Sequence, residues 1–357
     1  MMLLNSFKYK TKGWELSEIK PIHRSNLFVG RNATGKTRAI KALSNVASFM
    51  QSISQSAFWT DFSFDTAFSF IDPDNPGWTM EYGFQIKDGK VEKETLVVNG
   101  DRLIRRIKET SQYKGETIDP PKDKLVVQVR RDRTLYPEIE ALMSWVEGIS
   151  FVSCSIINPF TILNEHPGFI NPVPFSELVE SLKDSEKKKV LATARELGYD
   201  VVAMESVEYF TNLKLVSVRE RFFRSEFLNV QLSSGMLRVL YLLCFMEYIK
   251  HSEKISLLLI DDLGEGLDYS RATQLGQLIF QRCLQDGLQL IASSNDAFLM
   301  EVVDISNWQI LNRKGSKVSS MNQQSHPDLF RRFKMTGLSN FDFFSSDFID
   351  KYLHSQQ

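Results

Sequence analysis

The chain has 357 residues, 43% of them hydrophobic, which is enough to bury the core of one large or two modest domains. Its 43 lysines and arginines nearly balance its 44 aspartates and glutamates, which excludes a strong overall field toward nucleic acid or an anionic membrane. Three widely separated cysteines fit neither a disulfide framework nor a zinc site, so we expect a reduced, cytoplasmic protein. The strongest apolar run, Val239 to Met246, is far below the ~20 residues of a membrane span, and no membrane partner is expected.

The N-terminal part of the chain predicts a hairpin, then a strand, a glycine-rich turn and a helix. Residues 3–20 mix apolar and polar types around Gly13, a pattern typical of a β-hairpin. Residues 26–29 form a short apolar run that ends at Gly30, and residues 38–50 space their apolar side chains as an amphipathic helix does. A phosphate-binding loop requires elements in this order.

The middle of the chain predicts an antiparallel region followed by a mixed lobe. Residues 78–103 read as β-hairpins, residues 124–129 as a strand, residues 139–146 as a short helix and residues 177–197 as a longer one. A loop-rich stretch between the two helices is broken by prolines, namely Pro159, Pro167, Pro172 and Pro174.

Helices and strands alternate in the C-terminal part. Residues 235–250 and 271–286 predict helices, and residues 256–260 and 288–293 predict buried strands. This alternation indicates a parallel sheet. The aromatic-rich tail, residues 314–357, is expected to pack on the core as a strand and a helix, and a docking peptide for an effector protein is the alternative.

The strongest chemical signal is a glycine-rich segment that fits the phosphate-loop pattern GxxxxGK[ST] without a mismatch. In such a loop the backbone N–H groups point at phosphate oxygens, and the following helix adds the positive end of its dipole. We expect Lys36 to neutralise charge on the β- and γ-phosphates and Thr37 to bind Mg²⁺; a plain glycine-rich turn is the alternative. The ATP-binding residues are then Gly30, Arg31, Asn32, Ala33, Thr34, Gly35, Lys36 and Thr37.

An apolar strand that ends in two carboxylates is the second signal. At the carboxyl end of this strand, Asp261 would hold the Mg²⁺ hydration shell beside the phosphate loop. Asp262 would then face the attacking water. A buried strand that stops at an acidic turn is common, so this pattern alone is open to a purely structural interpretation.

A third signal precedes the apolar helix, where residues 232–238 read Leu-Ser-Ser-Gly-Met-Leu-Arg. Ser233, Ser234 and Gly235 can direct hydroxyls and free N–H groups at an anion. The alternative is that Ser234 only caps the helix.

Together these segments resemble the ABC-type ATPases, in which a signature of the form LSGGxxR precedes the acidic strand. In that class a loop ending Leu-Asp follows the acidic strand, and a later strand ends in a switch residue that is usually His. Asp268 and Asn295 hold these two places here. The resemblance implies that Asp268 belongs to the nucleotide site and that Lys36, Asp262 and Asn295 are the catalytic residues.

The resemblance also implies an α/β fold. This is the ABC-ATPase head of the P-loop NTPases, with a mostly parallel core sheet, an antiparallel β subdomain and an inserted helical lobe. We expect the ATPase domain over residues 1–313 and the tail over residues 314–357. Within the ATPase domain we expect the hairpin, phosphate loop and first helix at 3–50, a β insertion at 78–103, the lobe at 135–232, and the signature helix, acidic strand and switch strand at 233–313.

Two departures from the family pattern predict slow hydrolysis. The family's base is usually Glu, and Asp262 is one methylene shorter. Asn295 can hydrogen-bond a γ-phosphate but, unlike His, cannot become charged. If Asp262 is not the base, Glu265 is the next candidate.

The resemblance supplies a homodimer in which the signature of one copy covers the ATP of the other. The overall layout is most similar to stand-alone AAA-like ATPases related to the OLD group, many of which serve bacterial anti-phage defence, and this implies a separate effector such as a nuclease or toxin. A P-loop kinase of a small substrate and a DNA-binding repair or chromosome-associated ATPase are the alternatives. The arginines that would line a DNA groove are Arg130, Arg131, Arg133, Arg219, Arg221 and Arg224.

Overall fold

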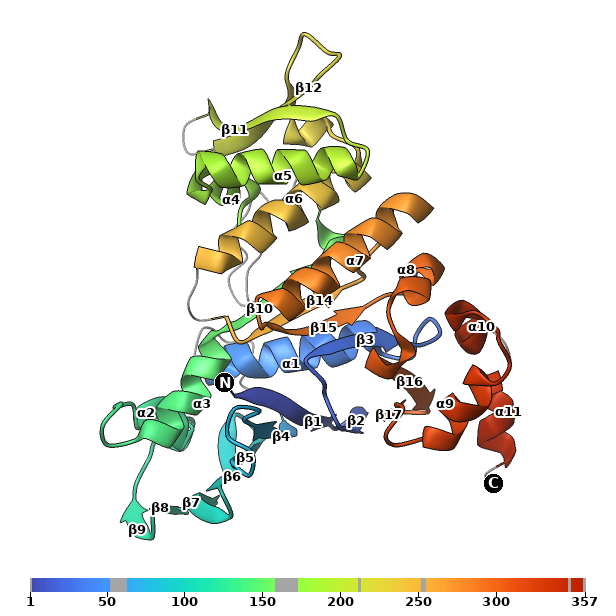
Figure 1. Ribbon diagram of the computed structural model, residues 1–357. Helices are drawn as coiled ribbons and strands as arrows, with labels where there is room; N and C mark the ends of the chain where they lie inside the picture. Colours follow the sequence, from blue (N-terminus) through green and yellow to red (C-terminus); the bar gives the residue numbers. More distant parts are fainter. Residues whose placement is uncertain are drawn as a thin grey trace.

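The computed structural model of the protein describes residues 2–51, 63–157, 173–210, 213–251, 255–345 and 348–355. The structure is built on a 14-stranded sheet (Figure 1). In order across the sheet the strands are β10 (Ile149–Ser153), β14 (Leu257–Asp261), β15 (Gln289–Ser293), β3 (Ser25–Val29), β16 (Trp308–Lys314), β17 (Lys317–Met321), β2 (Trp14–Ile19), β1 (Leu3–Thr11), β4 (Phe64–Ile71), β5 (Thr79–Lys87), β6 (Lys90–Val98), β7 (Asp101–Ile107), β8 (Thr110–Tyr113) and β9 (Glu116–Ile118).

The sheet as a whole is mixed rather than mostly parallel. Strands β10, β14, β15, β3 and β16 pair in parallel, and so do β17 and β2, whereas the other neighbours pair antiparallel. The antiparallel strands from β4 to β9 continue the same sheet, and they cover more chain than the expected insertion at 78–103. Strand β14 is buried along its whole length, which is typical of a parallel strand covered on both faces.

The helices of the described residues are α1 (Lys36–Met50), α2 (Val126–Val129), α3 (Pro137–Glu147), α4 (Phe175–Ser181), α5 (Asp184–Glu196), α6 (Ser234–Tyr248), α7 (Tyr269–Gln285), α8 (Ala297–Val302), α9 (Pro327–Lys334), α10 (Asn340–Ser345) and α11 (Phe348–Ser355). Among them, α1 and α7 pack directly on the parallel strands. Leu257 and Leu259 of β14 join the core that contains α1 and α3. Leu258 and Ile260 join the core that contains α6 and α7, so alternate side chains of one strand serve two cores. In the ribbon, α1 lies on one side of the parallel strands and α6 and α7 on the other (Figure 1).

The lobe that precedes the signature is not purely helical. It contains a three-stranded antiparallel sheet of β11 (Val201–Phe210), β12 (Leu213–Glu220) and β13 (Phe227–Leu228), against which α4 and α5 pack. The single helix expected at 177–197 is two helices, because the carboxylate of Glu186 accepts a hydrogen bond from the backbone N–H of Lys183 and starts α5 there. Pro159, Pro167 and Pro172 lie outside the described residues.

The strand expected at 124–129 is instead the short helix α2. Its first backbone N–H groups, those of Val126 and Val127, donate hydrogen bonds to the buried carboxylate of Glu94 at 2.7 and 3.2 Å. A remote side chain therefore decides the local structure, which the apolar pattern of these residues could not indicate.

The C-terminal tail packs on the core with one strand, β17, and three helices, where one strand and one helix were expected. Phe333 stacks on Phe343 with ring centroids 4.2 Å apart, and Phe343 in turn lies 6.2 Å from Trp308. All three rings are buried. In the part of the chain that the structure describes, no helix is long and apolar enough to cross a membrane.

Candidate nucleotide site

The turn between β3 and α1 has a backbone that only glycine permits at two positions. A Cβ atom on Gly30 would lie 2.5 Å from the Thr34 hydroxyl and 2.9 Å from the carbonyl oxygen of Leu311. Gly35 precedes α1 with a φ of 102°, in the left-handed region. Among the described residues no side chain caps α1, and its first turn carries no acidic residue. The N–H groups of this first turn are therefore available to bind an anion.

Lys36 is buried at the first position of α1, with 5% of its surface exposed. Its Nζ atom donates hydrogen bonds to the carbonyl oxygens of Gly30 at 2.6 Å and Arg31 at 3.4 Å. Burial lowers the pKa of Lys36, and the carboxylates of Asp262 and Asp261 oppose this shift. The lysine thus lies between the phosphate loop and the acidic end of β14.

Asp261 is fully buried at the end of β14 and has one oxygen without a partner. Its Oδ1 atom accepts a hydrogen bond from the Ser293 hydroxyl at 2.6 Å, whereas Oδ2 has no hydrogen-bond partner in the part of the chain that the structure describes. Burial raises the pKa of Asp261, and the Thr37 hydroxyl lowers it. A carboxylate oxygen and a neighbouring hydroxyl suit the hard cation Mg²⁺, so these residues fit the predicted metal site.

Asp262 follows with a φ of 56°, an uncommon conformation for a residue with a side chain. Its backbone N–H donates to the same Ser293 hydroxyl at 3.0 Å, so one serine holds both aspartates. Ser293 was not among the predicted site residues. Its place at the carboxyl end of β15, which pairs in parallel with β14, is the signal that could have identified it.

A cleft of about 570 Å³ lies beside the loop and brings Asn295 together with Lys36 and Thr37. Two of its arginines were not predicted. Arg313 donates a hydrogen bond to the carbonyl oxygen of Ala33 at 3.2 Å, and the guanidinium of Arg38 lies 4.6 Å from the centre of the Trp14 ring. Trp14 and Arg313 belong to no local motif, because only the tertiary structure brings β2 and β16 to the loop, whereas Arg38 directly follows Thr37 on α1. Asn32, Ala33 and Gly35 also line the cleft, whereas Gly30, Arg31 and Thr34 do not.

The signature residues lie outside this cleft. Ser233 caps α6 by accepting a hydrogen bond from the backbone N–H of Met236 at 3.3 Å, so the cap is Ser233 and not Ser234. Ser234 is exposed. The N-terminal ends of α6 and α7 lie on the same side of the molecule as the turn before α1 (Figure 1).

The loop that follows β14 contacts the signature helix, α6. Arg238 of α6 donates a hydrogen bond to the carbonyl oxygen of Glu265 at 2.8 Å. Asp268 caps α7 by accepting a hydrogen bond from the backbone N–H of Arg271 at 3.1 Å, and it forms an ion pair with the Arg271 side chain at 2.6 Å. Asp268 and Glu265 are exposed, and neither lines the cleft.

Two of the arginines considered for a DNA groove form ion pairs within the chain. Arg131 contacts Glu140 at 2.6 Å and Glu147 at 3.0 Å. Arg221 lies 3.8 Å from Asp200. These contacts give both arginines a structural role.

No protein-family model matches the chain, and no curated protein matches it in sequence. Among solved structures, the chain is similar to an SMC head bound to the C-winged helix domain of ScpA, with a TM-score of 0.56, 11% sequence identity, and coverage of 91% of this chain and 99% of that one. It is also similar to the SMC head domain from Thermotoga maritima, with a TM-score of 0.50, 13% identity, and coverage of 90% and 98%. At such identities the similarity shows the fold, which is that of an SMC head domain.

Proposed function

We propose that the protein is an ABC-type ATPase that binds ATP and Mg²⁺ at Lys36 and hydrolyses ATP slowly. The observation that carries the proposal is the buried Asp261, which has one oxygen without a hydrogen-bond partner among the described residues and whose pKa is lowered by the hydroxyl of Thr37, in the first turn of an uncapped helix. A buried carboxylate with an unused oxygen is costly unless a ligand completes its contacts. The SMC-head fold supports the same assignment.

Each residue then has a defined role. Residues 30–37 bind the phosphates through backbone N–H groups, with Lys36 close to the β- and γ-phosphates. Thr37 and Asp261 would hold Mg²⁺, which neutralises charge on the phosphate oxygens when bound. Asp262 accepts a proton from the attacking water, and Asn295 hydrogen-bonds the γ-phosphate. The short Asp262 side chain and the uncharged Asn295 side chain make the reaction slow.

We further propose that two copies close around two nucleotides. Ser233, Ser234 and Gly235 lie at the start of α6, outside the cleft of their own chain, and Ser234 is exposed. These residues and Asp268 would cover the ATP held by the second copy. ATP would then stabilise the dimer, because it binds the closed pair more tightly than the single chain.

The proposed biological role is control of a separate effector protein in anti-phage defence. This part rests on the resemblance of the motif order to the OLD-related ATPases. Three buried, unpaired cysteines suit a reducing cytoplasm. In the same proposal residues 1–313 are the ATPase domain and residues 314–357 are a tail packed on it. Of the six arginines considered for a DNA groove, Arg131 and Arg221 pair with carboxylates of the same chain, which makes these two less available to the DNA-binding alternative.

Light scattering and phosphate release, each measured with and without Mg²⁺ and ATP, test the proposal. The unmodified protein is expected to dimerise only with ATP. Lys36→Ala should lose ATP binding, dimerisation and hydrolysis together. Ser234→Glu should still bind ATP as a monomer but lose dimerisation and hydrolysis, because a carboxylate would face the phosphates of the second copy.

Lys90→Ala is the matched control, because Lys90 is an exposed lysine at the start of β6 and does not line the cleft. It should behave as the unmodified protein does. A protein that stays monomeric with ATP and yet hydrolyses it would contradict the dimer and keep the ATPase. An absence of ATP binding would contradict both.

A further inference from the structure

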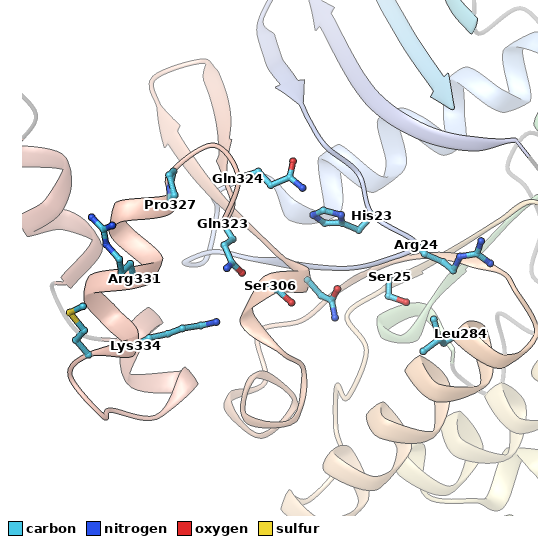
Figure 2. Close-up of a pocket in the computed structure, with 12 residues that line it drawn as sticks. His23, Arg24, Ser25, Leu284, Ser306, Gln323, Gln324, Pro327, Arg331 and Lys334 are labelled. Carbon is cyan, nitrogen blue, oxygen red and sulfur yellow. The ribbon is translucent and has the colours of Figure 1, made fainter. Parts of the chain in front are cut away.

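A second cleft, of about 1050 Å³, lies at the opposite end of β3 from the phosphate loop (Figure 2). Its walls come from four separate parts of the chain. His23, Arg24 and Ser25 lead into β3, and Leu284 lies near the end of α7. Residues 306–307 precede β16, and the remaining wall runs from Gln323 to Met335 and includes α9. The cleft is therefore built between the tail and the core.

The charged side chains that line this cleft are all positive. Among its twelve residues, all of them described by the structure, there are four basic side chains and no acidic one. Lys334 extends from α9 toward the segment that carries Ser306, and His23 lies on a separate segment that lines the same cleft (Figure 2). Arg331 is paired with Asp328 at 2.5 Å, and Arg24 donates to the carbonyl oxygen of Gly287 at 3.1 Å. The charge of Lys334 acts on the carboxylate of Asp304, whose pKa is lowered first by hydrogen bonds from Ser306 and then by Lys334, so Lys334 has the weakest internal partner of the three cations. Burial lowers the pKa of His23, which leaves its ring mainly as a neutral hydrogen-bonding group at pH 7.

The remaining lining residues suit a peptide. Asn307 and Gln323 offer amide groups that both donate and accept hydrogen bonds, as a peptide backbone requires. Two apolar side chains stand at the rim, Leu284 with 61% and Met335 with 79% of their surface exposed. A flexible, polarisable methionine is well suited to an apolar side chain of a ligand.

We propose that this cleft binds an acidic peptide segment of a protein partner. A carboxylate of the peptide pairs with Lys334, the amides of Asn307 and Gln323 bind its backbone, and an apolar residue contacts Leu284 and Met335. A single-stranded nucleic acid is the less suitable ligand, because none of the lining residues is Phe, Tyr or Trp and bases would have no ring on which to stack. The cleft is separate from the ATP site, so the inference does not depend on the proposed ATPase activity.

Selection from a random dodecapeptide display library on the immobilised full chain tests the proposal. The enriched peptides are expected to be acidic with an apolar residue among the carboxylates. Their affinity for Lys334→Glu should fall at least tenfold, and it should also fall as salt is raised. Arg332→Glu is the matched control, because Arg332 is an exposed neighbour on α9 that does not line the cleft, and it should change the affinity less than threefold.

Three outcomes would overturn the inference. They are a library that yields no binder, enriched peptides that are not acidic, and acidic peptides that bind Lys334→Glu and Arg332→Glu equally well. A twelve-nucleotide oligothymidylate that displaces the peptide and binds more tightly would assign the cleft to nucleic acid instead. Lys36→Ala should retain peptide binding, so failure of the ATP site and failure of this cleft can be told apart.

Discussion

Two carboxyl groups are fully buried in different halves of the sheet, and they differ in how their oxygens are satisfied. In the antiparallel half, Glu94 accepts hydrogen bonds on both oxygens, from the Tyr82 hydroxyl at 3.1 Å and from the N–H groups of Val126 and Val127 at 2.7 and 3.2 Å. In the parallel half, among the described residues only Oδ1 of Asp261 has a hydrogen-bond partner of ordinary geometry, and the Thr37 hydroxyl is near enough to lower the pKa of this carboxyl group. A buried carboxyl group with complete contacts stabilises the fold, whereas one with an unused oxygen is available to a ligand.

Of the substitutions that distinguish these two carboxyl groups, Asp261→Asn is expected to have the largest effect. The amide is nearly isosteric but is a poorer ligand for Mg²⁺. We expect kcat/KM for ATP to fall by roughly 1,000-fold, because both Mg²⁺ affinity and phosphate charge neutralisation suffer. Steady-state phosphate release measures this loss, and denaturant unfolding without nucleotide should show a change of less than about 1 kcal/mol.

Glu94→Gln is the matched control for that substitution, since it also replaces a buried carboxyl group by its amide. It lies in the antiparallel half and should leave kcat/KM within about twofold of the unmodified value. If Asp261→Asn left hydrolysis intact, Asp261 would be a second structural carboxyl group and the comparison would fail.

A smaller effect is expected from Asp262→Asn, which tests the proposed base. The amide cannot accept the proton of the attacking water, so kcat should fall by about 100-fold while the affinity for ATP is retained. Single-turnover hydrolysis measures this step apart from binding. An unchanged rate would transfer the role to Glu265, and Glu265→Gln would then be the slow variant.

The smallest effect concerns the pH dependence of stability. Burial raises the pKa of Glu94 to about 7 from its usual 4.5, against opposing contributions from the backbone N–H groups, Tyr82 and Arg106. The folded state therefore binds a proton more tightly than the unfolded state, and this contribution to stability is complete below pH 4.5 and lost as pH rises through about 7. Glu94→Gln should remove a decline of roughly 1–3 kcal/mol across this window.

Denaturant unfolding at several pH values measures that decline. The kcat/KM of Glu94→Gln for ATP shows whether the substitution has disturbed the candidate nucleotide site. An equally steep decline in Glu94→Gln would mean that another group titrates. Tyr82 and Arg106 face Glu94, while Asp119 and Asp123 act on Arg106.

The amino-acid sequence by itself predicted the glycine-rich turn between β3 and α1 and the buried strand β14 that ends at Asp261, and the structure contains both. The assignment of signature and switch residues also comes from sequence patterns alone and stays a prediction. Each is a local pattern whose chemistry depends on a few adjacent residues, as with Gly30, Gly35 and Lys36. The strand before the loop and the helix after it were also predicted, because their apolar spacing is local.

Only the tertiary structure decided what joins these segments. Ser293 holds both aspartates because β15 pairs beside β14, and Arg313 reaches Ala33 across 280 positions of sequence. The helix α2, predicted as a strand, forms where a distant Glu94 accepts its first N–H groups. A buried polar group must find a partner wherever the fold provides one, and sequence spacing carries no record of which partner that is.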